Sequence, residues 1–507
     1  MGKLWLTVIA MIAWFMAGVY RGAQGELTDG TSSASLVSPA PAASGGQQPA
    51  GGQGSETPPS SSQPAAPSLP PLSGVEGFTL QHEGETRNYF LPSFEYAGIA
   101  DTNALETVGH HRTNFASALI LNLDLQQVKR TSQFNLDYIG GEQLYTYPLT
   151  FGTPQESRFA FGYHSLNLAE QVWLRRWSFA FLDRLSYLPE AWFGFGGFAG
   201  LDTSEGGVGT GLGGGTFGAT PILASGLISN ETILTGRTRT FGNLATAEVG
   251  YKASARSDFT LAGGIGNFQY IDSGLLDSNY WFLLAGYNHR LTRRDEIGII
   301  YLDVLLTFHG INNERLVRGF ELAYGRQVTN RLALKLAAGP LASSFAKPLG
   351  GSVTKGLWST EDSLEYRLRQ SVLTASFTRM VTNGGGVLLG AETSLFTVGI
   401  NCPLRRRVDG SLNFGYAYNQ SLTPLASSTY PAKFATYTAI ASISRQWGKH
   451  MSLFITYTVD RQASNTPISF SNGAPGAIFW RQMGTIGINV HRRPGLLEAG
   501  MPANRSH

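Results

Sequence analysis

The chain has 507 residues, a length that allows either several soluble domains or one large all-β unit. Charged residues make up only 14% of it, glycine (62 residues) and aromatic residues (11%) are abundant, and no internal apolar run reaches the ~18 residues of a transmembrane helix. The net charge is +3 and the arginines are scattered, which argues against nucleic-acid binding. The single cysteine, Cys402, excludes an intrachain disulfide and a cysteine-based zinc cluster.

The N-terminal residues have the pattern of an export signal followed by a linker. Residues 1–25 combine a basic start, an apolar run and the small residues Ala23 and Gly25 before Glu26, which predicts a cleaved signal peptide rather than a retained anchor. Residues 26–78 consist largely of Ser, Pro, Gly, Ala, Gln and Thr, and such a segment buries too little apolar area to offset the ordering of its backbone. We expect a disordered periplasmic linker there, with a partner-binding segment as the alternative.

From Tyr89 onward the apolar periodicity is two, which predicts strands, and residues 79–492 are assigned to one β domain. In residues 411–419, one face carries Leu412, Phe414, Tyr416 and Tyr418, and the other carries Ser411, Asn413, Gly415, Ala417 and Asn419. One face of such a strand suits lipid and the other suits water. Because the alternating segments are about 9–14 residues long, they fit tilted membrane strands rather than the shorter strands of a soluble sandwich.

The joins between these strands are predicted to alternate between tight and long. Tight joins include residues 129–130 and 254–256, and long ones include residues 140–159, 188–242 and 342–361. Short periplasmic turns and long extracellular loops are typical of outer-membrane barrels, whose closure leaves no sheet edge in lipid. The sequence therefore predicts an all-β fold, a transmembrane antiparallel up-and-down barrel of about eighteen strands, with sixteen as the alternative count and residues 493–507 as a periplasmic tail.

Several barrel segments carry a family resemblance. They read F-N-L-D-Y-I-G-G-E at residues 134–142, R-R-W-S-F at 175–179, L-S-Y-L-P-E at 185–190, G-A-E-T at 390–393, R-R-R-V-D-G-S-L-N-F-G-Y from Arg405, and G-I-N-V-H-R-R-P at 487–494. With them, residues 85–495 resemble an uncharacterised family of porin-like bacterial outer-membrane β-barrel proteins. The resemblance implies the fold and the location in the cell outer membrane, and it implies no substrate.

The longest join, residues 188–242, is rich in glycine and includes Gly206, Gly209, Gly211 and Gly214. Loops of such length are usually functional or disordered, so we expect either a segment that folds into the lumen as a constriction or plug, or a mobile surface loop. Gly209, Gly211 and Gly214 also match the dinucleotide fingerprint G-x-G-x-x-G. The motif requires a surrounding βαβ unit, which the sequence does not show. A glycine-rich segment of low complexity explains the match better, and we expect no cofactor.

Two histidine-containing patterns could indicate a metal site or a catalytic site. His110 and His111 are adjacent, so in an extended chain they point apart, and no third ligand is evident; we expect no metal site. His164 and Ser165 fall on opposite faces of a strand, and no G-x-S-x-G motif is present. The sequence therefore predicts a protein that is not an enzyme.

Charged residues at inward positions are the candidates for lining the lumen. They are Asp124, Asp137, Arg184, Asp303, Glu365, Arg367, Arg369 and Asp460. Acidic and basic groups on a lumen wall set the field that selects polar solutes. Asp183 has the parity of outward residues, where a charge costs energy, so we expect a bulge or a change of parity there.

The sequence favours a porin-like channel for passive passage of small hydrophilic solutes, because about eighteen strands enclose more space than inward side chains fill. A structural or adhesive surface barrel and a polysaccharide exporter are the alternatives. The expected partners are outer-membrane lipids, the barrel-assembly machinery and small polar solutes. A homo-oligomer is a further alternative, although the sequence identifies no subunit interface.

Overall fold

The computed structural model describes residues 72–73, 88–104, 113–150, 157–188, 232–234, 239–271, 275–310, 313–346, 352–423, 431–465, 478–491 and 495–496. All of them belong to one compact unit of the chain, residues 66–507. Among these residues no helix is both long enough and apolar enough to cross a membrane.

The described residues form eighteen long strands and one short one. The first nine are β1 (Tyr89–Asp101), β2 (Asn114–Val128), β3 (Ser132–Thr150), β4 (Ser157–Trp173), β5 (Trp177–Leu188), β6 (Thr240–Lys252), β7 (Ser257–Tyr270), β8 (Ser278–Arg290) and β9 (Asp295–Phe308). The others are β10 (Asn313–Thr329), β11 (Leu332–Ala346), β12 (Ser352–Arg367), β13 (Val372–Thr382), β14 (Ala391–Arg405), β15 (Val408–Ser421), β16 (Lys433–Gln446), β17 (Met451–Ser464), β18 (Phe479–His491) and the two-residue β19 (Gly495–Leu496).

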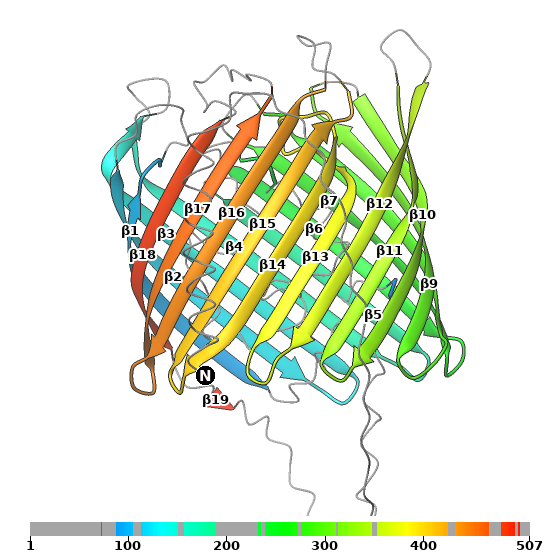
Figure 1. Cartoon of the computed structure of the whole chain (residues 1–507), viewed down its shortest axis with the longest axis horizontal. Coiled ribbons are helices and arrows are strands. Elements are labelled where there is room, and N and C mark those ends of the chain that lie inside the picture. Colours follow the sequence, from blue (N-terminus) through cyan, green and yellow to red (C-terminus); the bar gives the residue numbers. More distant parts are fainter. Residues whose placement is uncertain are drawn as a thin grey trace, which may run out of the picture. The chain divides into compact units, whose positions relative to one another are not determined.

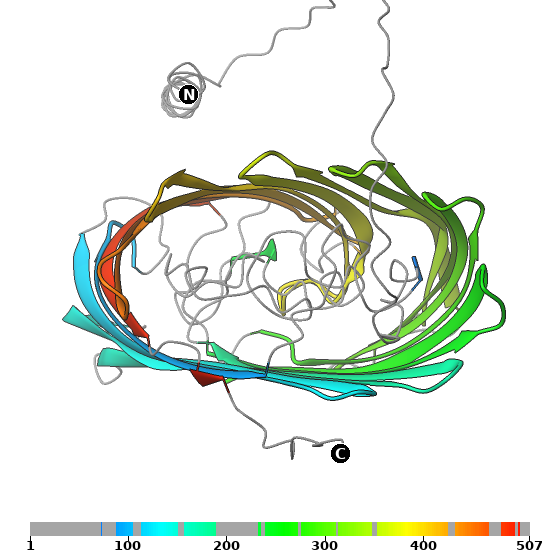
Figure 2. The same ribbon diagram turned by 90° about the horizontal axis from the view of Figure 1, so that it is seen from below.

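The long strands close into one antiparallel barrel (Figures 1 and 2). Each strand pairs with the next along the chain, and β1 closes the ring by pairing with β18 from Ser93↔His491 to Asp101↔Met483. β19, in the segment expected to be a tail, adds the pairs Tyr89↔Leu496 and Phe90↔Gly495 to β1. The predicted eighteen-stranded up-and-down barrel is confirmed, and the sixteen-strand alternative is wrong.

Side chains alternate between the two faces of the wall, and the outer face is apolar. In β9, Ile297 and Ile299, at odd-numbered positions, are 41% and 51% exposed. Ile300 and Val304, at even-numbered positions, face inward and are buried. Trp281 and Trp358 lie on the outer face toward the long-loop end, and Trp447 lies in a short turn at the other end. Aromatic residues in these places suit the two interfaces of a lipid bilayer.

The joins follow the predicted alternation only in part. The tight turns occur where expected, but β3, β4, β11 and β12 extend further than predicted, so the joins expected at residues 140–159 and 342–361 shrink to residues 151–156 and 347–351. The join between β9 and β10, residues 309–312, lies on the long-loop side and is as short as the turns on the opposite side. Strand pairing continues to Thr150↔Ser157 between β3 and β4 and to Ala346↔Ser352 between β11 and β12.

The irregularity expected at Asp183 is absent. Its pairs with Leu168 in β4 and Ala245 in β6 belong to unbroken registers. Asp183 keeps its outward parity and accepts a hydrogen bond from Asn243 Nδ2 at 2.9 Å. A polar partner on the same face, rather than a bulge, compensates the carboxylate.

Candidate functional site

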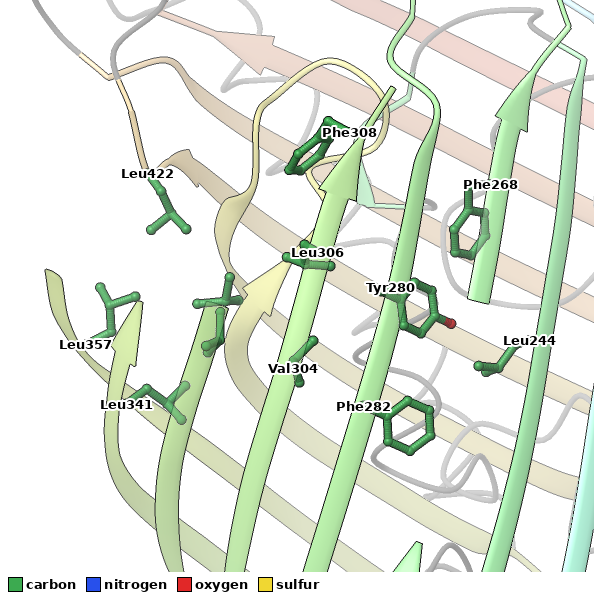
Figure 3. Close-up of a cluster of buried hydrophobic side chains, with 12 residues drawn as sticks. Leu244, Phe268, Tyr280, Phe282, Val304, Leu306, Phe308, Leu341, Leu357 and Leu422 are labelled. Atoms are coloured by element: carbon green, nitrogen blue, oxygen red, sulfur yellow. The ribbon is translucent and has the colours of Figure 1, made fainter. Parts of the chain in front are cut away.

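The lumen is the candidate functional site, and its wall has two unlike halves. One half, the apolar wall, is a buried cluster centred on the inner faces of β6–β12, with Tyr280 and Phe282 on β8 and Val304, Leu306 and Phe308 on β9 (Figure 3). The other half, the polar wall, comprises the inner faces of β15–β18 and β1–β4. Many of its buried side chains are Ser, Thr, Asn or Gln, beside an apolar cluster that includes Ala97, Ala118 and Ile120; the polar ones include Gln126, Asn135, Gln171, Asn419, Thr436, Thr456 and Thr485.

Three of the candidate charged residues lie in one row that crosses four neighbouring strands. Asp124 on β2 pairs in register with Asp137 on β3, which pairs with Asn167 on β4, which pairs with Arg184 on β5. We call these four residues the charged row. All four are half-buried, and they have the parity of buried inward residues such as Gln126 and Leu182.

The charged row places a pair of carboxylates beside each other and a guanidinium two strands from the nearer one. Neighbouring strands lie about 4.8 Å apart, so Arg184 is roughly 10 Å from the strand of Asp137 and roughly 14 Å from the strand of Asp124. Opposite charges at these separations create a field along the lumen wall. The sequence identified the charged residues, but only the register shows that they lie in one row across neighbouring strands.

A second group of charges lies on the inner faces of β11 and β12. The candidates Glu365 and Arg367 form an ion pair, with Nε and Oε1 3.0 Å apart. Next to them, Lys335 Nζ and Glu361 Oε1 are 2.8 Å apart and both side chains are almost fully buried. Sequence reasoning missed Lys335 and Glu361, although Lys335 alternates with the apolar outward neighbours Leu334 and Leu336.

Asp460, a further candidate, belongs to a buried network beside the β1–β18 seam. It accepts a hydrogen bond from Thr438 Oγ1 at 2.6 Å and pairs in register with Arg481 on β18. Arg481 in turn binds Asp101 at the end of β1, with Nη2 and Oδ2 2.7 Å apart and exposed side-chain fractions of 3% and 0%. This ion pair, which the sequence analysis missed, ties together the two strands that close the ring.

The structure places two candidates away from the lumen wall. Asp303 lies on the outer face of β9 with Ile299 and Tyr301, and it pairs with Arg318 at 3.0 Å. Residues 299–306 are apolar on both faces apart from Asp303, so alternation in the sequence could not fix its direction. Arg369 lies in the exposed turn between β12 and β13, beyond the end of the wall.

The segment between β13 and β14, residues 383–390, folds into the barrel, and we call it the inward segment (yellow within the ring in Figure 2). The Gly386 carbonyl accepts a hydrogen bond from Leu276 N at 2.8 Å, and Asn383 Nδ2 donates to Ser278 Oγ at 3.0 Å. Ser278 is the first residue of β8 and Leu276 lies two residues before it, and β8 is five strands from β13 around the ring. The inward segment therefore crosses part of the lumen.

Two features hold the inward segment in this course. Gly384, Gly385, Gly386 and Gly390 have positive φ angles of 79°, 62°, 72° and 79°, which L side chains rarely adopt. Arg315 on β10, only 1% exposed, donates from Nη2 to the Leu389 carbonyl at 2.9 Å. The run of three glycines was the sequence signal that could have found this segment.

Part of the long join between β5 and β6 also lies against the inner wall. Thr232 binds Asn419, with Thr232 Oγ1 donating at 2.9 Å, and Leu234 exchanges backbone hydrogen bonds with the Gln462 side chain at 2.7 and 2.8 Å. Ile233 is buried in one cluster with Leu388 of the inward segment. The glycines expected to form the constriction, Gly206, Gly209, Gly211 and Gly214, lie outside the described residues.

The histidines considered for metal binding and catalysis are only partly within the described residues. His110 and His111 lie outside the described part of the chain. His164 is exposed and contacts Tyr138, with Nδ1 3.0 Å from the hydroxyl, whereas Ser165 is buried on the opposite face. Within the described residues, no three His, Cys, Asp or Glu side chains gather as a metal site would require.

No protein-family model and no curated protein matches the chain. Among solved structures, the outer membrane protein OpdK from Pseudomonas aeruginosa matches with a TM-score of 0.38 and 10% identity, over 80% of this chain and 99% of that one. OccK2 (OpdF) of the same organism, in complex with glucuronate, matches with a TM-score of 0.39 and 10% identity, over 80% of this chain and 98% of that one. Because these TM-scores and identities are low, the function proposed below depends on this chain's own residues.

Proposed function

We propose that the chain is an outer-membrane channel through which small hydrophilic solutes pass along the charged row. The observation that carries this proposal is a closed barrel with an apolar outer face and a row of half-buried charges on its inner face. A barrel that served only as an anchor would have no need of partly solvated carboxylates and a guanidinium in one row on its inner wall. In this proposal the short turns face the periplasm.

Reconstitution into planar bilayers tests the proposal. The purified full chain, shown to be folded by its heat-modifiable migration on gels, is expected to give stepwise, ohmic conductance. A folded protein that remains electrically silent would instead favour the surface-anchor alternative.

The charged row is expected to set the ion preference of the channel. Replacing Arg184 by Gln removes the positive charge of the row and keeps its two carboxylates, so cation selectivity should increase. Replacing Asp124 and Asp137 by Asn should shift the preference toward anions. In either case we expect a change of about two- to fivefold in the permeability ratio, since a unit charge several ångströms away contributes on the order of 1–2 kcal/mol before screening by salt.

Reversal potentials in a salt gradient measure this effect. Asp303→Asn is the matched control, because it removes one carboxylate from the outer face of the same barrel. Equal reversal potentials in all variants would remove the charged row from the conduction path.

The glycine-rich part of the long join is proposed to narrow the lumen together with the inward segment. Thr232 and Leu234, which are bound to the inner wall, support this placement for the join that contains Gly206, Gly209, Gly211 and Gly214. Deleting residues 206–215 should raise the single-channel conductance. Unchanged conductance would mean that these residues lie outside the narrowest part of the path.

A further inference from the structure

Leu72 and Ser73, which precede β1 and fall within the segment expected to be a linker, lie against the inner wall at β7, β8 and β9 (short blue segment within the ring in Figure 2). The Leu72 side chain is 1% exposed and belongs to a buried cluster with Ala262, Leu284 and Ile300. An apolar side chain in a Ser- and Pro-rich segment is thus withdrawn from water by one particular site in the barrel.

The backbone and side chain of Ser73 are bound by the same wall. Ser73 N donates to Asn288 Oδ1 at 3.1 Å, and Asn288 Nδ2 donates to Ser73 Oγ at 2.7 Å. Thr260 Oγ1 donates to the Ser73 carbonyl at 3.4 Å, and the Ser73 and Thr260 hydroxyls also contact each other. Asn288 Nδ2 donates to Asp258 Oδ1 as well, at 2.8 Å, which orients the amide toward Ser73.

Gly286 provides the space for Ser73. A Cβ at position 286 would lie 2.1 Å from both Ser73 Cβ and Ser73 Oγ, closer than atoms can approach. Any side chain there would therefore displace Ser73. The wall therefore fits Ser73 in shape, binds it by reciprocal hydrogen bonds and buries the apolar Leu72 beside it.

We propose that the inner faces of β7–β9 carry a docking site for the N-terminal arm, the residues that precede β1, and that docking holds this arm in the short-turn mouth of the barrel. Thr260 is three residues from the start of β7 and Asn288 two residues from the end of β8, both short-turn ends. At about 3.3 Å per residue, the site lies roughly 10 Å inside that mouth. β8 is also seven strands from β1 around the ring, so the chain is attached near the far side of the mouth from the strand that it enters.

Docking of Leu72 and Ser73 on this wall does not depend on the proposed channel function.

Cysteine accessibility tests docking without reference to conduction. In a Cys402→Ser background, Ser73→Cys in the folded full chain is expected to react with a membrane-impermeant maleimide at least about tenfold more slowly than Ala253→Cys, a substitution in an exposed short turn. Adding Gly286→Ala on the wall, or Leu72→Asp on the arm, should bring the two rates to within about twofold. Gly484→Ala is the matched control for Gly286→Ala, since a Cβ at position 484 meets no atom within 4 Å, and it should leave Ser73→Cys protected.

Equal labelling of Ser73→Cys and Ala253→Cys with the unmodified wall would overturn the docking site. Persistent protection in both Gly286→Ala and Leu72→Asp would overturn it too, because the wall and the arm residues would then not determine the burial. If every variant is electrically silent while the labelling follows the expected pattern, the docking site is supported and the channel function fails.

Discussion

Replacing Arg481 by alanine is expected to lower the free energy of unfolding by about 3–5 kcal/mol, because the substitution removes the guanidinium that pairs with the buried Asp101 carboxylate. The Asp101 side chain is fully buried and also accepts hydrogen bonds from Asn103 N at 3.0 Å and from Tyr145 Oη at 3.4 Å. Since the pair joins β1 to β18, we expect the loss to open the ring at its seam. Urea-induced unfolding in lipid vesicles measures the change.

The control is Arg461→Ala. Arg461 lies on the neighbouring strand β17 and is exposed, so its replacement should alter stability by no more than about 0.5 kcal/mol. The double substitution Arg481→Met with Asp101→Leu should recover much of the stability, because it removes both charges. Equal stability of Arg481→Ala and Arg461→Ala would show that the pair does not secure the seam.

Replacing Arg315 by alanine is expected to release the inward segment from β10. This guanidinium is a buried, charged donor in its hydrogen bond to the Leu389 carbonyl. Loss of such a bond costs about 1.5–3 kcal/mol of docking free energy. The equilibrium therefore shifts roughly ten- to hundredfold from the docked toward the released segment. Single-channel recordings should therefore show frequent transitions to a level of higher conductance.

Arg318→Ala provides a close control, three residues along the same strand. Arg318 is on the outer face, with 57% of its side chain exposed, and pairs with Asp303. The Arg318→Ala variant should have the same conductance levels as the unmodified protein. If Arg315→Ala shows the same conductance levels as Arg318→Ala, the inward segment does not restrict the path.

Much of the barrel was predictable from residues that are close in sequence. The alternation in residues 411–419 assigned the faces of β15, and the tight turns assigned the order of the strands. Prediction was less successful where local signals are weak: in β9, apolar residues on both faces concealed the outward direction of Asp303, and in β3 and β12 the alternation did not mark where the strands end. The glycines of residues 383–390 indicated an unusual backbone but not its direction into the barrel.

The sequence by itself determined the antiparallel barrel, a strand number near eighteen and two chemically different faces, because side-chain direction in a strand depends only on the parity of neighbouring positions. Only the tertiary structure decided the count of eighteen, which charges lie in one row across the strands, that Arg481 meets Asp101 across the seam, and that the inward segment and Leu72 enter the lumen. These features depend on the register of strands and on contacts between residues separated by hundreds of positions, such as Ser73 with Asn288. No local pattern in a sequence specifies such contacts, since they form only when the ring has closed.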